Sequence, residues 1–140
     1  MRFLGSFDSV VLAAVAAELE PLVGARLQRA IQPAADEIVL HLRRPAGPAA
    51  VLCSIHPRWA RAHLVPAVSG SGTVGPFARL LRSRLEHARL RAVRQMPFER
   101  ILELAFETDT GVVELIAELM GRHSNLILVQ DGVIAGALRA

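Results

Sequence analysis

The stretch from Glu118 to Gln130 decides how the chain is interpreted, and it reads Glu-Leu-Met-Gly-Arg-His-Ser-Asn-Leu-Ile-Leu-Val-Gln. Two apolar runs flank a short polar break at Gly121-Arg122-His123-Ser124. Glycine allows a positive φ or a close backbone approach, and the three residues after it supply hydrogen-bond donors. The second run ends at Asp131-Gly132, a strong signal for a hairpin turn. Spacing alone therefore predicts two strands joined as a β-arch with a polar tip.

The remaining sequence predicts two helices and several short strands around this stretch. One helix should cover 9–20 after an N-cap at Asp8, and another should cover 77–87 after Pro76, which suits a first helical turn. Alternating apolar residues predict strands at 25–32, 37–43, 49–55, 60–65, 89–95, 100–107, 112–120, 125–130 and 133–138. Because the connections are of hairpin length, antiparallel pairing is favoured. We therefore predict one α+β domain, an antiparallel β-sandwich with two helices against it.

The same alternation assigns individual side chains to the faces of the strands. Leu27 and Ile31 are expected on one face of their strand. Leu40 and Leu42 are expected to point inward, whereas His41 between them should point outward. Each strand would then present one apolar face to a common core.

The distribution of charge indicates a polyanionic partner. The net charge is +3, and all 16 basic residues are arginine. Nine arginines lie between Arg58 and Arg100 against two acidic residues, whereas 101–118 carries five acids and no basic residue. A basic block suggests a phosphate-rich partner, and the alternative is a solvated surface balanced by the acidic neighbouring strand. Few aromatics are present, so a stacking platform for single strands is not expected.

Several function classes are not supported by the sequence. One cysteine, Cys53, makes no internal disulfide and is expected to be a buried small hydrophobe. The chain shows no leader-like apolar run and no segment long enough to span a bilayer, which predicts a cytoplasmic protein without a membrane partner. The five histidines lack metal-ligand spacing, and no phosphate-binding or hydrolase motif is present. We therefore expect no metal, no cofactor and no catalytic residues.

The polar residues that remain lie at three breaks between strands. The breaks are His56-Pro57-Arg58-Trp59-Ala60-Arg61-Ala62-His63-Leu64, Pro97-Phe98-Glu99-Arg100 and Arg122-His123-Ser124. Arginine binds phosphate in bidentate geometry, so three such corners on one edge could grip an RNA backbone. Alternatively, each break satisfies orphan backbone groups, with Glu99 and Arg100 as a local surface ion pair. The candidate RNA-binding residues are His56, Arg58, Arg61, Glu99, Arg100, Arg122, His123 and Ser124.

Three stretches of the chain resemble the NFACT-N domain, in the order found in that family. They are the His-Pro-x-x-Ala-Arg-x-His-Leu run at His56–Leu64, the segment from Arg82 to Arg100, and the run Glu118–Asn125. The family comprises bacterial RqcH, animal NEMF and the proteins long labelled fibronectin-binding protein A. Its members are several hundred residues longer, so residues 1–140 look like one N-terminal domain without the later domains. The resemblance implies a fold similar to the N-terminal lobe of MutM/Fpg glycosylases.

The resemblance also implies a function in ribosome-associated quality control. RqcH-type proteins bind large ribosomal subunits that carry stalled peptidyl-tRNA, and they recruit alanyl-tRNA for template-free C-terminal tailing. The family's Asp-Arg pair, which serves tRNA recruitment, falls on Glu99 and Arg100, so the acid here is longer by one methylene. Two alternatives are a fibronectin-binding surface protein and a MutM-like nucleic-acid-binding module. Glycosylase chemistry is not expected, because the start is Met1-Arg2 instead of proline and glutamate.

Overall fold

The computed structural model describes residues 9–66, 75–96 and 100–139, which form an α+β fold. In chain order the elements are α1 (Ser9–Leu19), η1 (Glu20–Leu22), β1 (Arg26–Ala34), β2 (Glu37–Arg44), β3 (Gly47–Ser54), β4 (Arg61–Val65), α2 (Pro76–Leu85), β5 (Arg89–Gln95), β6 (Ile101–Thr108), β7 (Gly111–Glu118), η2 (Gly121–His123), β8 (Asn125–Gln130) and β9 (Val133–Ala137), where η marks a 3-10 helix. Every predicted strand is present, with ends displaced by no more than two residues. The predicted fold class is confirmed; the predicted N-cap, Asp8, lies outside the described residues.

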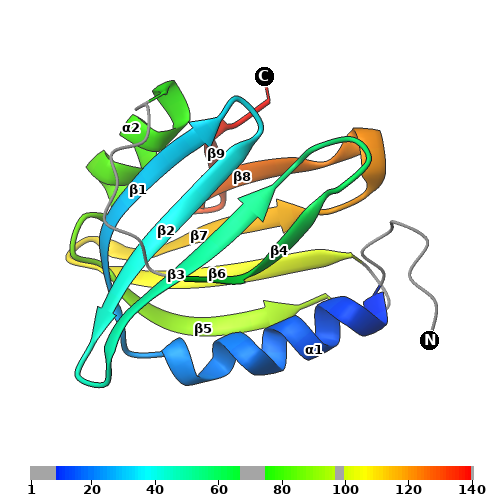
Figure 1. Cartoon of the computed structure of the whole chain (residues 1–140). Coiled ribbons are helices and arrows are strands. Elements are labelled where there is room, and N and C mark those ends of the chain that lie inside the picture. The colour runs from blue at the N-terminus through cyan, green and yellow to red at the C-terminus, as the bar shows by residue number, and fades with distance from the viewer. Residues whose placement is uncertain (1–8, 67–74, 97–99, 140) are drawn as a thin grey trace.

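The nine strands form one antiparallel sheet that folds over on itself. Their order is β4-β3-β2-β1-β5-β6-β7-β8-β9. The strand ladder passes from one half to the other at the register pair Arg26–Arg89, between β1 and β5. Figure 1 shows β1–β4 and β5–β9 as facing layers. Large buried side chains from both layers, such as Leu40 and Phe106, belong to one apolar cluster. Burial of the apolar faces of both layers against each other therefore produces the sandwich that the alternation of apolar residues along the strands predicts.

The two helices cover the two open sides of this folded sheet. Helix α1 packs against β4 and β5, and α2 packs against β1 and β9. The α1 stripe Leu12, Val15 and Leu19 is buried in the common core, as residues at helical spacing should be. None of the helices in the described ranges is long and apolar enough to cross a membrane.

The edge of β1 beyond Arg26 is completed by α2 and the residues after it. The backbone N–H of His87 donates to the Leu27 carbonyl at 3.1 Å, and the Leu27 N–H donates to the Ala88 carbonyl at 2.8 Å. Further along, the Arg82 Nε donates to the Ala30 carbonyl at 3.0 Å. Buried backbone groups need such partners, so α2 is fixed beside β1 by hydrogen bonds as well as by packing.

One face assignment made from the sequence is wrong, and a second is right in direction although the side chain is buried instead of exposed. A β-bulge in β1 shifts the register between Leu27 and Arg29. Because one extra residue reverses the side-chain alternation, Leu27 joins the main core and Ile31 joins a separate cluster on the other face. His41 does point away from the main core, as predicted, but its side chain is only 6% exposed. This outer face of β1–β3 carries an apolar cluster of its own.

Burial of His41 makes stability depend on pH. Its Nε2 is buried and has no hydrogen-bond partner among the described residues. Burial, and next the charge of Arg29 on the neighbouring strand, lowers the pKa of His41 below its ordinary value of 6.5. The unfolded chain therefore binds more protons near pH 6, so stability is complete above about pH 6.5 and falls as the pH drops through that value.

We expect acidification to destabilise the wild-type chain more than a His41→Leu variant. Thermal unfolding followed by circular dichroism between pH 7.5 and 5 should show that the free energy of unfolding falls more steeply for the wild type. The difference between the two slopes should be at most about 1.4 kcal/mol per pH unit. The leucine variant keeps the site apolar and cannot titrate. Parallel pH profiles for the two proteins would contradict a lowered pKa at His41.

Candidate functional site

The polar break Gly121-Arg122-His123-Ser124 connects two neighbouring strands. Strands β7 and β8 pair in register from Val113–Gln130 to Glu118–Asn125. The predicted β-arch is therefore wrong, because the break is the tip of a hairpin within one sheet. Gly121 has a φ of 60°, the left-handed region that favours glycine. The turn at Asp131-Gly132 also has positive φ at both residues, 55° and 73°, as its sequence predicts.

Ser124 holds the tip together from inside the protein. Its Oγ donates to the Gly121 carbonyl at 2.6 Å, and its backbone N–H donates to the same oxygen at 3.1 Å. The side chain is fully buried. The expectation that Ser124 faces RNA is therefore wrong, since its hydroxyl stabilises the turn. Arg122 and His123 beside it are exposed.

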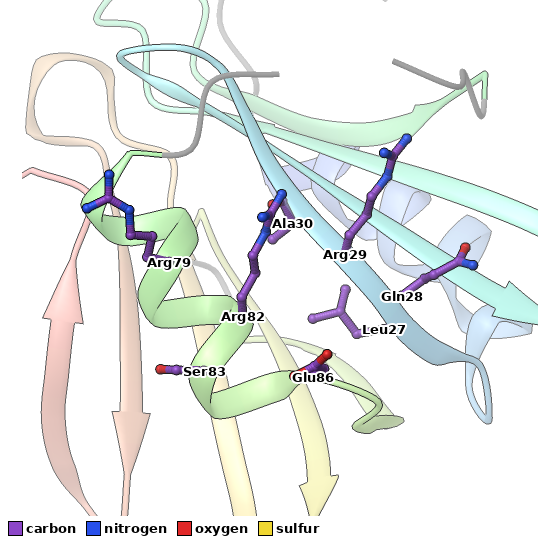
Figure 2. Close-up of a pocket in the computed structure, with 8 residues that line it drawn as sticks. All are labelled: Leu27, Gln28, Arg29, Ala30, Arg79, Arg82, Ser83 and Glu86. Carbon is purple, nitrogen blue, oxygen red and sulfur yellow. The ribbon is translucent and has the colours of Figure 1, made fainter. Parts of the chain in front are cut away.

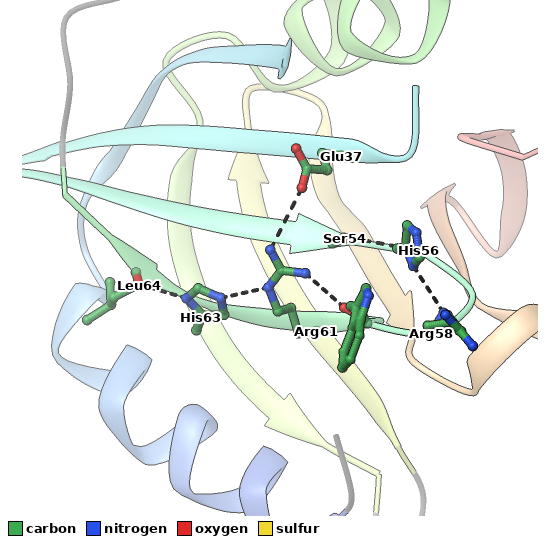
Figure 3. Close-up of polar contacts among 8 residues, drawn as sticks. Glu37, Ser54, His56, Arg58, Arg61, His63 and Leu64 are labelled. Carbon is green, nitrogen blue, oxygen red and sulfur yellow. Dashed lines mark hydrogen bonds and ion pairs between the residues drawn. The ribbon is translucent and has the colours of Figure 1, made fainter. Parts of the chain in front are cut away.

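The β3–β4 connection is also held by its own polar residues, as Figure 3 shows. The His56 Nδ1 accepts a hydrogen bond from the Arg58 N–H at 3.1 Å. The Arg61 guanidinium donates to the Trp59 carbonyl at 3.0 Å and to the His63 Nε2 at 3.1 Å, and it lies 3.8 Å from a Glu37 carboxylate oxygen. Arg61 and His56 thus have structural partners, whereas the Arg58 side chain is exposed.

The third break approaches the β7–β8 tip from β6. Arg100 is half-buried, and its carbonyl accepts a hydrogen bond from the Leu119 N–H at 2.9 Å. Leu119 directly follows β7 and comes two residues before Gly121. The contact therefore places the Arg100 backbone close to the β7–β8 tip. Glu99, its predicted partner, lies outside the described residues, so the Glu99–Arg100 pair stays a prediction.

Two residues that the sequence analysis did not single out join these segments. The Arg139 guanidinium donates to the Arg122 carbonyl at 2.6 Å and to the Ile55 carbonyl at 3.4 Å. The Asn125 side chain in turn clamps the Arg139 backbone, with its Nδ2 on the carbonyl and its Oδ1 on the N–H, both at 2.9 Å. Asn125 belongs to the quoted run at Glu118–Asn125, but nothing in the sequence marks Arg139.

The turns are also in direct contact. A Cβ built on Gly121 would lie 3.7 Å from the Pro57 carbonyl oxygen, so the β7–β8 tip lies against the β3–β4 connection. In Figure 1 both connections lie at the same end of the molecule. We call this region the polar corner and define it as residues 55–59, Arg100, residues 121–125 and Arg139. The sequence places these segments far apart, and the fold brings them together.

The polar corner presents hydrogen-bond donors and positive charge. Arg58, Arg122 and His123 are exposed there, and Arg100 is half-buried. Guanidinium groups match the geometry of phosphate oxygens.

Elsewhere, burial raises the pKa of the Cys53 thiol to about 12, so this cysteine stays protonated at neutral pH. No group of three His, Cys, Asp or Glu residues among those described could hold a metal ion.

Comparison with protein families gives the assignment. Residues 8–139 match the family model described as NFACT N-terminal and middle domains. The chain belongs to this NFACT family. It is 29% identical over 143 residues to the Rqc2 homolog RqcH of Bacillus subtilis and 35% identical over 131 residues to that of Streptococcus suis. These alignments cover 96% and 89% of this chain but only 25% and 24% of the relatives.

Solved structures confirm the NFACT fold. The N-terminal domain of the fibronectin-binding protein PavA from Streptococcus pneumoniae superposes with a TM-score of 0.87 at 30% identity. The N-terminal part of the fibronectin/fibrinogen-binding protein from Streptococcus suis gives 0.87 at 34% identity. Each comparison covers 96% of this chain and 54% of the other. The chain therefore corresponds to about a quarter of the curated relatives and half of the solved chains.

Proposed function

We propose that the polar corner binds the sugar-phosphate backbone of RNA, and that its ligand in the cell is tRNA on the large ribosomal subunit. The observation that supports this proposal is the convergence of three separate segments on one accessible region that carries Arg58, Arg100 and Arg122. The Arg139 link between Ile55 and Arg122 preorganises two of these segments. Backbone segments that are already held together lose less conformational entropy when a ligand binds across them.

The family membership supports a role in ribosome quality control. Its relatives carry the name Rqc2 homolog RqcH. We extend this to the finer function: the domain contributes to recognition of stalled peptidyl-tRNA and to recruitment of alanyl-tRNA for C-terminal tailing in the cytoplasm. In this proposal it is a binding module without chemistry of its own. Arg100 retains the arginine of the family pair, and Glu99 supplies the acid with a longer reach.

Removing cations of the polar corner should weaken tRNA binding without unfolding the domain. Arg100→Ala and Arg122→Ala each delete a guanidinium, so the slope of log K against log salt should fall by about one for each lost phosphate contact. Filter binding with purified tRNA at several salt concentrations measures this slope. The matched control is Arg91→Ala, an exposed arginine on β5 outside the corner whose partner Glu107 is 4.0 Å away.

The control separates a site from a general charge effect. If Arg91→Ala weakened binding as much as Arg100→Ala and Arg122→Ala, the corner would be no more than part of a basic surface. Thermal unfolding of each variant establishes that the fold is intact. Co-sedimentation of the chain with large subunits from translation-stressed cells then tests the ribosomal partner; material that remains in the supernatant would contradict it.

A second candidate function is fibronectin binding. It is favoured by the two solved neighbours, which are named as a fibronectin-binding protein and a fibronectin/fibrinogen-binding protein. Surface plasmon resonance with immobilised fibronectin tests it on this chain. A response that survives Arg100→Ala and Arg122→Ala would place that activity outside the polar corner.

A further inference from the structure

Three adjoining cavities follow helix α2 and the outer face of β1, at a distance from the polar corner. A cavity of about 510 Å³ lies between α2 and β1, as Figure 2 shows. It shares Leu27 and Gln28 with a second cavity of about 250 Å³, which shares Arg26 and His87 with a third of about 500 Å³. We call this continuous depression the arginine trough. Its walls include seven arginines and three acids, which gives a formal charge of about +4 from these side chains.

A row of three arginines runs across the floor of the trough. Arg26 on β1 is the register partner of Arg43 on β2 and also of Arg89 on β5. Opposed residues of antiparallel strands project from the same face, and like charges placed directly opposite destabilise a sheet. Among the described residues, no carboxylate forms an ion pair with any of these three arginines. The fold thus contains a repulsive arrangement that a bound anion would relieve.

Two hydrogen bonds fix the direction of guanidinium groups along the trough. The Arg26 Nη1 donates to the His87 carbonyl at 3.0 Å, and His87 has a φ of 62°, a conformation that costs energy for a residue other than glycine. The Arg82 Nε donates to the Ala30 carbonyl at 3.0 Å, and Arg82 lines the first cavity. In Figure 2, Arg82 extends from α2 toward β1, and Arg29 extends from β1.

We infer that the arginine trough is a second RNA-binding surface, which holds a sugar-phosphate backbone along the outer face of β1. The proposal rests on the proposed RNA-binding function and adds a separate contact to it. An extended polyanion fits better than a single phosphate, because the three cavities follow one another and the arginines are distributed along them. A duplex arm of a tRNA has this form, with phosphates at regular intervals.

The test uses substitutions in the row that leave its hydrogen bonds in place. Arg43→Thr with Arg89→Thr removes the two outer cations and retains Arg26 and its bond to His87; threonine suits a strand. The loss of two phosphate contacts should make tRNA binding less sensitive to salt. The affinity at 50 mM salt divided by the affinity at 200 mM salt should be about tenfold smaller for this variant than for the wild type. The control for each single substitution is Arg94→Thr, which removes the same charge from an exposed residue on β5 that lines none of the three cavities.

A stability measurement accompanies the binding assay. Because Arg43 repels Arg26, Arg43→Thr should leave the Tm unchanged or raise it by about 1–4 °C while it weakens tRNA binding. A residue with a purely structural role would lower the Tm when replaced. Weaker binding together with an undiminished Tm therefore supports the trough, and a lower Tm with unchanged binding overturns it.

The outcomes separate this inference from the proposed function. If the row variants bind like Arg94→Thr while Arg100→Ala binds weakly, the trough proposal is overturned and the polar corner stands. If the row variants bind weakly while the corner variants do not, the trough stands and the corner fails. A wild-type chain that binds no tRNA overturns both. Competition by polyglutamate as strong as competition by tRNA, at equal charge, would overturn the assignment to RNA.

Discussion

Replacement of Phe106 by alanine should remove about 3–5 kcal/mol of folding free energy, a large part of the 5–15 kcal/mol typical of a domain. Phe106 is fully buried on β6, in the middle of the β5–β9 layer, with Leu90 and Val113 as its register partners. It belongs to the cluster that also contains side chains of β1–β4 and of both helices. Truncation would therefore leave a cavity where the two layers meet.

Urea unfolding monitored by fluorescence of Trp59 and by circular dichroism measures this loss. Phe106→Leu should cost less than about 1.5 kcal/mol, because it retains most of the volume. Ile134→Ala, at a side chain that is 64% exposed, should change stability by less than about 0.5 kcal/mol. A cost below about 1 kcal/mol for Phe106→Ala would mean that the two layers do not share one packed core.

The strands could be predicted because each carries its own local signal. The alternation at 37–43 and 112–120 fixes strand type, and Asp131-Gly132 fixes a hairpin whose positive φ values the structure contains. The β1 bulge could not be predicted, because it depends on pairing with β2 and not on any residue of β1 alone. The burial of His41 was missed for a similar reason, since a second apolar cluster covers the outer face of β1–β3.

The candidate site could be predicted only in its parts. Each polar break is visible in the sequence as a group of hydrogen-bond donors between two apolar runs. Because the strands follow one another as hairpins, each break is expected at the end of a strand. That the β3–β4 connection touches the β7–β8 tip follows from the folding of the sheet at Arg26–Arg89, which no local pattern encodes. Ser124 was misassigned because a hydroxyl that caps a turn and one that binds a ligand look alike in sequence. The arginine row is visible only once register is known.

The second large effect is expected at Asn125. Its side chain accepts hydrogen bonds from the N–H groups of Leu126 and Arg139 and donates one to the Arg139 carbonyl, each at 2.9 Å. Asn125→Ala removes all three, which should cost about 2–3 kcal/mol at roughly 1 kcal/mol per bond. Because Arg139 then loses its anchor, its guanidinium no longer holds Arg122 to Ile55. Affinity for tRNA should fall at least as far as in Arg122→Ala.

A double-mutant cycle distinguishes this linkage from two independent losses. Asn125→Ala and Arg139→Ala each remove the Arg139 link between the β7–β8 tip and the β3–β4 connection. The free energy of unfolding lost in the double variant should therefore be smaller than the sum of the two single losses, by at least about 0.5–1 kcal/mol. Asn125→Asp is the matched control, because it keeps the Oδ1 acceptor for both N–H groups and replaces the Nδ2 donor by an oxygen that faces the Arg139 carbonyl. Its stability and tRNA affinity should lie between those of the wild type and Asn125→Ala. Strictly additive costs would show that Asn125 and Arg139 act separately, and the polar corner would then lack the internal brace on which its preorganisation depends.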